Sequence, residues 1–310
     1  MREMAFLFPG QGSQYVGMGK AAMETYTASK KVFQMAEDIT GLPIQKLCFE
    51  GPIEELTRTI NLQPAITAVN LALLKVIIER GMLPKTCAGH SLGEYSALAC
   101  AGVLSFEDTL RAVKKRAELM DREAQKKKGN MAAIMGVGIE DLESILSEVG
   151  DEVCIANYNS RDQLVISGSA EGVEFAISKI KEKGGKAIPL KVSGAWHSKL
   201  MEGALKDFEI FLDQLTFNPP KIPVIFNLNA SQITSPQDIK QAMVKQLISP
   251  VKWVQSVESM LDMDVDTFVE IGPKNVLSNL VRRILPQDTK VQVINIEEPK
   301  DIEEKFKGIF

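Results

Sequence analysis

Residues 86–93 read Thr-Cys-Ala-Gly-His-Ser-Leu-Gly, and they give the strongest local indication of the fold. A short apolar run leads into Gly-x-Ser-x-Gly, the pattern of a strand that turns sharply into a helix and raises a serine hydroxyl at the turn. The glycines permit the strained backbone and its close approach to neighbouring chain. The first amides of the following helix would face an oxyanion formed at Ser91. An ordinary turn also matches five residues of this kind, so the rest of the chain has to decide.

The histidine count points to a partner for this serine. Only His90 and His197 occur in the 310 residues. His90 lies inside the elbow, which leaves His197 as the free candidate for the base that a serine nucleophile requires. A solitary histidine is more often structural than catalytic, but His197 is the one imidazole otherwise available to Ser91. We therefore interpret it as the general base.

The composition is that of a globular protein, with 45% hydrophobic residues and a formal charge of −4. The acidic balance and the few aromatic residues argue against nucleic-acid binding. No run approaches the ~20 apolar residues that span a bilayer, and the N-terminus lacks a signal-peptide pattern. The four cysteines show no metal-ligand spacing. These features predict a cytoplasmic protein without a metal site.

Short apolar runs alternate with long helical patterns through most of the chain. Strands are expected at 4–8, 86–88, 224–226 and 268–271, and helices at 20–38, 52–59, 64–80, 92–102, 106–124, 201–215, 276–284 and 297–307, the last of them solvated. Strands that alternate with helices indicate a parallel sheet covered on both faces. The fold class is therefore α/β, with an α/β-hydrolase-like large domain.

Residues 126–193 follow a different pattern and are predicted to form a second domain. Strands at 131–137, 153–158, 163–167 and 187–192 and helices at 139–149 and 170–183 give the order β-α-β-β-α-β, typical of a ferredoxin-like domain. This segment separates Ser91 from His197, so it is an insertion into a catalytic domain of residues 1–125 and 194–310. A cleft between the two domains, with Ser91 and His197 at its floor, is expected.

Several motifs in order along the chain resemble those of the malonyl-CoA:acyl carrier protein transacylases, and the match runs nearly end to end. They are the N-terminal loop Phe8-Pro-Gly-Gln-Gly-Ser-Gln14, the elbow Gly89-His-Ser-Leu-Gly-Glu94, Arg116 within residues 115–120, His197-Ser198, the late loop of residues 246–253 and the turn Glu270-Ile-Gly-Pro273.

The resemblance implies a role for each matched position. Ser91 would take the acyl group from a thioester and pass it to a second thiol, while His197 accepts and returns the proton. The backbone amides of Gln11 and Leu92 would form the oxyanion hole. Gln246 would orient His197 through its main-chain carbonyl, so its side chain is expected to matter little.

Arg116 would select the acyl group, because a guanidinium pairs with the free carboxylate of a malonyl group through two parallel hydrogen bonds. Without the resemblance, a solvated helix arginine is the simpler reading. Trp196 stands where malonyl-specific members commonly carry phenylalanine. Relatives of polyketide assembly lines use the same framework to hydrolyse acyl groups from carrier proteins, and this remains the alternative function.

The resemblance implies malonyl-CoA and a phosphopantetheinylated acyl carrier protein as substrates, no cofactor, no membrane and a monomer, in fatty acid or polyketide biosynthesis. Lysines at 126–128 and at 179, 181 and 183 would attract an acidic carrier protein or simply be solvated. A general esterase is disfavoured, because its histidine usually lies near the chain end and 113 residues follow His197. A catalytically dead scaffold is disfavoured by the joint presence of Ser91, His197, Gln11 and Arg116.

Overall fold

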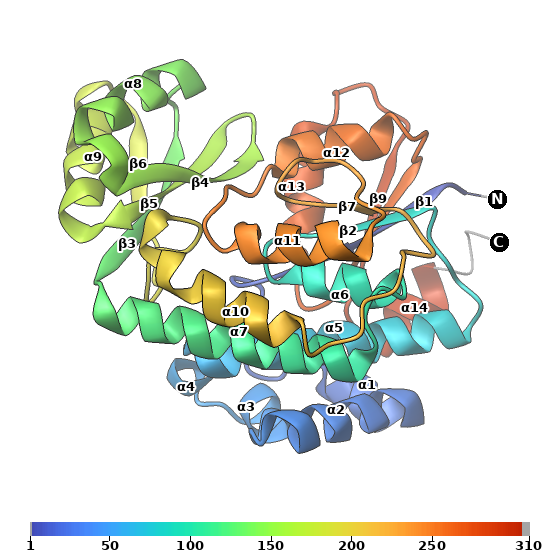
Figure 1. The fold of residues 1–310 in the computed structure, drawn as a ribbon. Helices are drawn as coiled ribbons and strands as arrows, with labels where there is room; N and C mark the ends of the chain where they lie inside the picture. Colours follow the sequence, from blue (N-terminus) through green and yellow to red (C-terminus); the bar gives the residue numbers. More distant parts are fainter. Residues whose placement is uncertain (1, 306–310) are drawn as a thin grey trace.

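The strand β1 (Met4–Phe8) is buried along its whole length and lies at the centre of a five-stranded sheet in the computed structural model, which describes residues 2–305 (Figure 1). The strand order is β7-β2-β1-β8-β9, and every pairing is parallel. The other strands are β2 (Thr86–Gly89), β7 (Val224–Ile225), β8 (Thr267–Ile271) and β9 (Gln292–Ile296). The parallel sheet expected from the sequence is confirmed, and β9 is a strand that the sequence reading missed.

Successive residues of β1 point to opposite faces of this sheet, and each face has its own core. Phe6 and Phe8 join the core that contains the helices of the N-terminal half, whereas Ala5 and Leu7 pack with α12 (Trp253–Leu261) and α13 (Val276–Ile284). The first core is built from α1 (Lys20–Thr25), α2 (Thr27–Thr40), α3 (Ile44–Phe49), α4 (Ile53–Thr57), α5 (Thr59–Glu79), α6 (Gly93–Cys100), α7 (Phe106–Lys126), α10 (Leu205–Leu212) and α11 (Pro236–Gln246). Both faces are therefore covered, as an all-parallel sheet requires.

Helix α5 is the central element of the larger core. By length and composition alone it is apolar enough to cross a membrane, but 89% of its most hydrophobic window is buried inside the protein. It begins at Thr59, five residues before the expected start, and includes Pro64 within the helix. The early start matters for the site, because it places Gln63 on this buried helix with 1% of its surface exposed.

The second sheet contains β3 (Gly129–Met135), β4 (Val153–Ser160), β5 (Gln163–Ser169) and β6 (Lys186–Pro189), with α8 (Ile139–Val149) and α9 (Ala170–Glu182). Its order is β4-β5-β3-β6 and its pairings are antiparallel. This is the ferredoxin-like arrangement that the order of elements predicted. Figure 1 shows it at the upper left, with α7 running beneath both sheets. The boundaries at residues 126 and 193 remain predictions.

The second sheet carries helices on one face only. Ala132 and Ile134 pack under α8 and α9, whereas Met131 and Ala133 face the larger core. The edge strand β4 is also hydrogen-bonded to the segment that precedes α12. The Val251 N–H donates to the Ala156 carbonyl at 2.8 Å, and the Val251 carbonyl accepts from the Tyr158 N–H at 2.9 Å. The face without helices therefore looks toward the elbow.

Three expectations about helices are corrected by the structure. The helix expected at 20–38 is broken at Tyr26, whose extended backbone (φ −117°) separates α1 from α2. The helix expected at 201–215 begins as a 3₁₀ helix, Lys199–Ala204, before α10. The C-terminal helix α14 (Pro299–Lys305) is not simply solvated, because Asp301 and Ile302 are buried. Residues 306 and 307 of that prediction lie outside the described residues.

Candidate active site

Ser91 sits at the turn between β2 and α6 in a left-handed backbone conformation, with φ +51°. The turn is compact enough to require glycine on both sides. A Cβ at Gly89 would meet the carbonyl carbon of Gly93 at 1.9 Å, and a Cβ at Gly93 would meet the carbonyl oxygen of Phe8 at 1.8 Å. No real Cβ tolerates such contacts, so the two glycines are a steric requirement of the elbow.

The buried side chain of Asn227 holds the elbow from the neighbouring strand. Its Oδ1 accepts from the Ser91 N–H at 2.7 Å, and its Nδ2 donates to the Gly89 carbonyl at 2.7 Å. Asn227 follows β7, which lies beside β2 in the sheet, and its side chain is fully buried. One amide thus satisfies both a donor and an acceptor of the strained turn. The sequence reading missed this residue, although a polar residue after an apolar strand was a usable signal.

The Ser91 hydroxyl lies 2.7 Å from Nε2 of His197. The other ring nitrogen, Nδ1, faces two main-chain carbonyls, those of Gln246 at 2.9 Å and Ser249 at 3.0 Å. Because carbonyls only accept, Nδ1 carries the proton and Nε2 is left to accept from the serine. Burial, followed by the charge of Arg116, lowers the pKa of His197 to about 3. The imidazole is therefore neutral and able to accept a proton at physiological pH.

Arg116, on α7, is buried in the site and only 2% exposed, so it is not the solvated helix arginine of the simpler reading. Its Nη2 donates to Ser91 Oγ at 3.2 Å and to Gln246 Oε1 at 3.2 Å, and its Nη1 donates to Gln63 Oε1 at 2.7 Å. Among the side chains that the structure describes, no carboxylate forms an ion pair with it. A desolvated guanidinium beside the Ser91 hydroxyl, held by neutral amide oxygens, is suited to an anionic ligand.

A cavity of about 140 Å³ lies above Ser91, between the elbow and the second sheet. It is lined by Gln11, His90, Ser91, Met131, Asn157, Asn159, Val165, Leu190, Val192, Trp196 and His197. The backbone N–H groups of Gln11 and Leu92 donate to no other group of the described chain. Donors free of a protein partner beside the Ser91 hydroxyl are the arrangement that an oxyanion hole would need there.

The second histidine bridges the two parts of the molecule. His90 Nε2 lies 2.8 Å from Asn159 Oδ1 of β4, and its ring packs against Trp253 with 5.5 Å between the ring centroids. Burial lowers the pKa of His90, so this imidazole is neutral as well. Among the described residues, no hydrogen bond joins the His90 ring to the Ser91 hydroxyl, so His197 is the histidine that pairs with Ser91.

The side chain of Gln246, which the resemblance left without a role, makes three hydrogen bonds in the site. Its Nε2 donates to the Ser91 carbonyl at 3.1 Å and to Glu94 Oε1 at 2.8 Å, while its Oε1 accepts from Arg116. Glu94 is fully enclosed beneath the elbow, and burial raises its pKa to about 7 against the opposing hydrogen bonds from Asn227 and Gln246 and the charge of Arg116. Sequence reasoning missed Glu94, although an acid directly after the elbow was visible.

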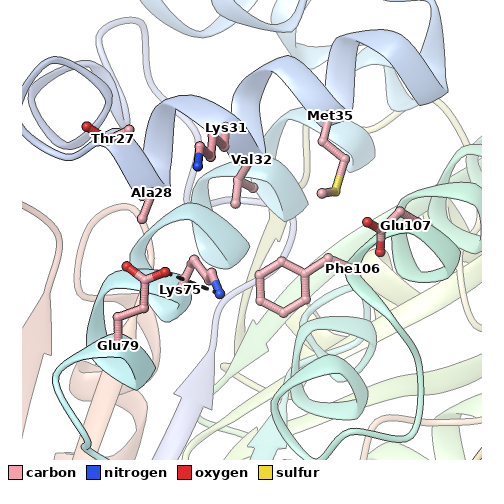
Figure 2. A pocket seen from close by; sticks show the side chains of 9 residues that line it. All are labelled: Thr27, Ala28, Lys31, Val32, Met35, Lys75, Glu79, Phe106 and Glu107. Atoms are coloured by element: carbon pink, nitrogen blue, oxygen red, sulfur yellow. Dashed lines mark ion pairs between the residues drawn. The ribbon is translucent and has the colours of Figure 1, made fainter.

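Two further observations concern metal binding and a second depression away from Ser91. Where the structure describes the side chains, no group of three or more His, Cys, Asp or Glu residues is arranged to hold a metal ion. A larger depression, of about 580 Å³, lies between α2, the end of α5 and the start of α7, where the Lys75–Glu79 ion pair and Phe106 line it (Figure 2). It shares no lining residue with the cavity at Ser91.

Comparisons with known proteins show the family and the fold of the chain. The family model described as "Acyl transferase domain" matches residues 5–301. The malonyl CoA-acyl carrier protein transacylase of Bacillus subtilis is 43% identical over 98% of this chain and 96% of its own length. A crystal structure of an acyl carrier protein S-malonyltransferase from Vibrio cholerae is 38% identical, covers 97% and 99% of the two chains and has a TM-score of 0.92. A type II PKS acyl carrier protein complex with its malonyl-transacylase matches with a TM-score of 0.94 and 36% identity, over 99% of both chains.

Proposed function

The chain belongs to the acyl transferase family, among its malonyl-CoA:acyl carrier protein transacylases, and from this premise we propose how its residues carry the reaction. The reaction is the transfer of a malonyl group from malonyl-CoA to the phosphopantetheine thiol of an acyl carrier protein, in fatty acid or polyketide biosynthesis. An acyl-serine intermediate allows two thiols to use one site in succession.

Ser91 and His197 carry the covalent chemistry in this proposal. Ser91 Oγ attacks the thioester carbonyl as its proton passes to His197 Nε2, and the coenzyme A sulfur leaves with that proton. The carrier thiol then gives its proton to Nε2 and attacks the ester carbon, after which Ser91 Oγ leaves and takes the proton back. The 2.7 Å contact and the neutral imidazole support both half-reactions. The main-chain carbonyls of Gln246 and Ser249 stabilise the imidazolium that forms in between.

The amides of Gln11 and Leu92 stabilise the negative charge that develops on the carbonyl oxygen. This role is supported by their lack of other acceptors in the described chain and by the position of Leu92 directly after the nucleophile. Preorganised backbone donors of this kind need no rearrangement when the tetrahedral intermediate forms, which is why they lower the barrier.

The observation that carries the malonyl assignment is the buried Arg116 guanidinium, 3.2 Å from Ser91 Oγ and without an ion-paired carboxylate among the described side chains. A malonyl group on Ser91 brings a carboxylate to this cation, whereas an acetyl group brings only a methyl. The charge-assisted pair formed by malonyl is worth roughly 1.5–3 kcal/mol. Selectivity for a dicarboxylic acyl unit follows.

The test compares malonyl-CoA with acetyl-CoA in wild type and in Arg116→Ala. We expect the ratio of malonyl to acetyl kcat/KM to fall about 10–150-fold, with acetyl transfer similar or improved. Arg116→Lys should recover part of the ratio, because a point charge lacks the planar fork. An unchanged ratio in Arg116→Ala would remove Arg116 from the acyl pocket.

Hydrolysis of acyl carrier proteins is the second candidate, and the observation that favours it is Trp196, whose bulky ring lines the cavity. Water would then replace the carrier thiol at the same acyl-serine. Labelled malonyl-CoA distinguishes the two, since transfer places the label on the carrier protein and hydrolysis releases free malonate. A label that accumulates as malonate in the presence of carrier protein would favour the hydrolase.

The remaining features of the proposal concern the whole protein. We propose a cytoplasmic monomer whose protein side chains suffice for catalysis without a cofactor, acting on malonyl-CoA and a phosphopantetheinylated carrier protein. The division into a catalytic domain of residues 1–125 and 194–310 and an inserted domain of residues 126–193 belongs to the same proposal. It is supported by the two separate sheets.

A further inference from the structure

Glu94 is a buried acid that the reaction described above does not use, yet both of its carboxylate oxygens are engaged beneath the nucleophile. Oε2 accepts from the Asn227 N–H at 2.6 Å, and Oε1 accepts from Gln246 Nε2 at 2.8 Å. The side chain is 1% exposed. A carboxylate that only accepts hydrogen bonds determines which atoms of its neighbours must face it.

The Gln246 amide is oriented by this carboxylate. Its nitrogen points to two acceptors, Glu94 Oε1 and the Ser91 carbonyl, so its oxygen must point the other way, toward Arg116 Nη2. The Gln63 side-chain amide, which also contacts the guanidinium, has the same orientation. Its Nε2 donates to Thr59 Oγ1 at 2.9 Å, so its Oε1 faces Arg116. Arg116 therefore meets amide oxygens rather than amide nitrogens.

We propose that Glu94 is a positioning residue for acyl selectivity, which acts by locking the Gln246 amide with its oxygen toward Arg116. The inference rests on the proposed role of Arg116 as the partner of the malonyl carboxylate. Glu94 touches no substrate; it sets the placement of the cation that does. Its effect is on the choice of acyl group and not on the attack by Ser91.

Glu94→Gln tests this because it keeps the shape and removes one acceptor. The Asn227 N–H is a fixed main-chain donor, so the new side chain must place its oxygen there and its NH₂ toward Gln246. Gln246 then either turns its own NH₂ against Arg116 or leaves two NH₂ groups facing each other. Both arrangements leave a buried donor unpaired and displace the guanidinium. Asn227 keeps its acceptor, so the elbow is preserved.

The measurement is the ratio of malonyl to acetyl kcat/KM at pH 8, with thermal unfolding as a check on folding. We expect the ratio to fall about 10–100-fold in Glu94→Gln, mostly through a higher KM for malonyl-CoA, with acetyl transfer within about threefold of wild type. Glu94→Asp, which keeps two acceptor oxygens, should retain more of the ratio than Glu94→Gln.

The matched control is Glu270→Gln. Glu270 is equally buried but accepts from the Leu277 and Ser278 N–H groups at the start of α13. The ratio of malonyl to acetyl kcat/KM in Glu270→Gln should equal that of wild type. A folded Glu94→Gln protein with an unchanged ratio, or with equal losses for both substrates, overturns the inference.

Two additional variants keep the result decisive. If Glu94→Gln does not fold, Gln246→Met removes the same amide while keeping the main-chain carbonyl that faces His197, and an unchanged ratio there overturns the inference. Arg116→Ala separates the two proposals. If its ratio is also unchanged, the malonyl role of Arg116 fails; if its ratio falls while that of Glu94→Gln does not, only the role of Glu94 fails.

Discussion

Asn227→Ala is the substitution whose effect follows most directly from the hydrogen bonds of the elbow. The change removes the acceptor of the Ser91 N–H and the donor to the Gly89 carbonyl, both at 2.7 Å. Each buried backbone group left unpaired costs about 1–3 kcal/mol, so we expect the free energy of unfolding to fall by about 2–6 kcal/mol. Asn227 is fully buried and touches no solvent, so this loss of stability reflects the two hydrogen bonds of the elbow and not a change at the surface.

The same variant should slow acylation of Ser91 in addition to lowering stability. Ser91 holds a left-handed φ of +51°, a conformation that persists only while its surroundings enforce it. Urea denaturation gives the change in unfolding free energy, and a stopped-flow measurement with malonyl-CoA gives the acylation rate. Asn229→Ala, two residues along and exposed, is the matched control and should leave both quantities near wild type. A loss of less than about 1 kcal/mol with a normal acylation rate would show that Asn227 does not hold the elbow.

Ser91→Ala should form no acyl-enzyme, and a mass increase of one malonyl group after incubation with malonyl-CoA would contradict the assignment. His197→Ala should reduce transfer by about 10²–10⁴-fold, the range for a lost general base; near-normal turnover at neutral pH would exclude that role. Gly93→Ala should fail to accumulate as folded protein, because its Cβ would meet a β1 carbonyl oxygen at 1.8 Å; a native circular dichroism spectrum and melting temperature would refute this. Burial raises the pKa of Glu270 from 4.5 to about 7, so between pH 4.5 and 7 the folded protein binds more protons than the unfolded chain. The free energy of unfolding therefore falls as pH rises from 4.5 to 7, by at most about 3 kcal/mol. Urea titrations across this range should show a shallower pH dependence in Glu270→Gln, with a remainder from Glu94, whose pKa is raised in the same direction.

Local patterns in the sequence predicted most of the architecture, although not strand β9. The Gly-x-Ser-x-Gly run predicted the elbow because only glycine fits where Gly89 and Gly93 approach neighbouring backbone. The β-α-β-β-α-β order predicted the antiparallel second sheet because each element carries its own apolar period. Helix ends were predicted less well, as the break at Tyr26 and the early start of α5 show. Tertiary packing decides those positions, and propensity is a weak guide to them.

The candidate site was likewise predicted only in part from the sequence. Ser91, His197 and Arg116 could be named from motifs, and the structure brings them within hydrogen-bond distance, while their roles remain predictions. The sequence could not indicate that Ser249 offers a second carbonyl to His197, because every residue has a carbonyl and only folding determines where it points.

The residues beneath the site were decided by tertiary structure alone. Gln63 and Asn227 lie far from the elbow in the sequence, Gln63 on a helix before it and Asn227 after a strand that follows the inserted segment. Glu94 follows the elbow directly, but the sequence does not distinguish it from the many other acidic residues. A buried polar side chain is defined by the partners that satisfy it, and those partners meet only when the sheet and helices have packed. Motifs along the chain were enough to indicate the chemistry of this protein, whereas the hydrogen bonds that hold Arg116 and the elbow in place depend on the packing of distant elements.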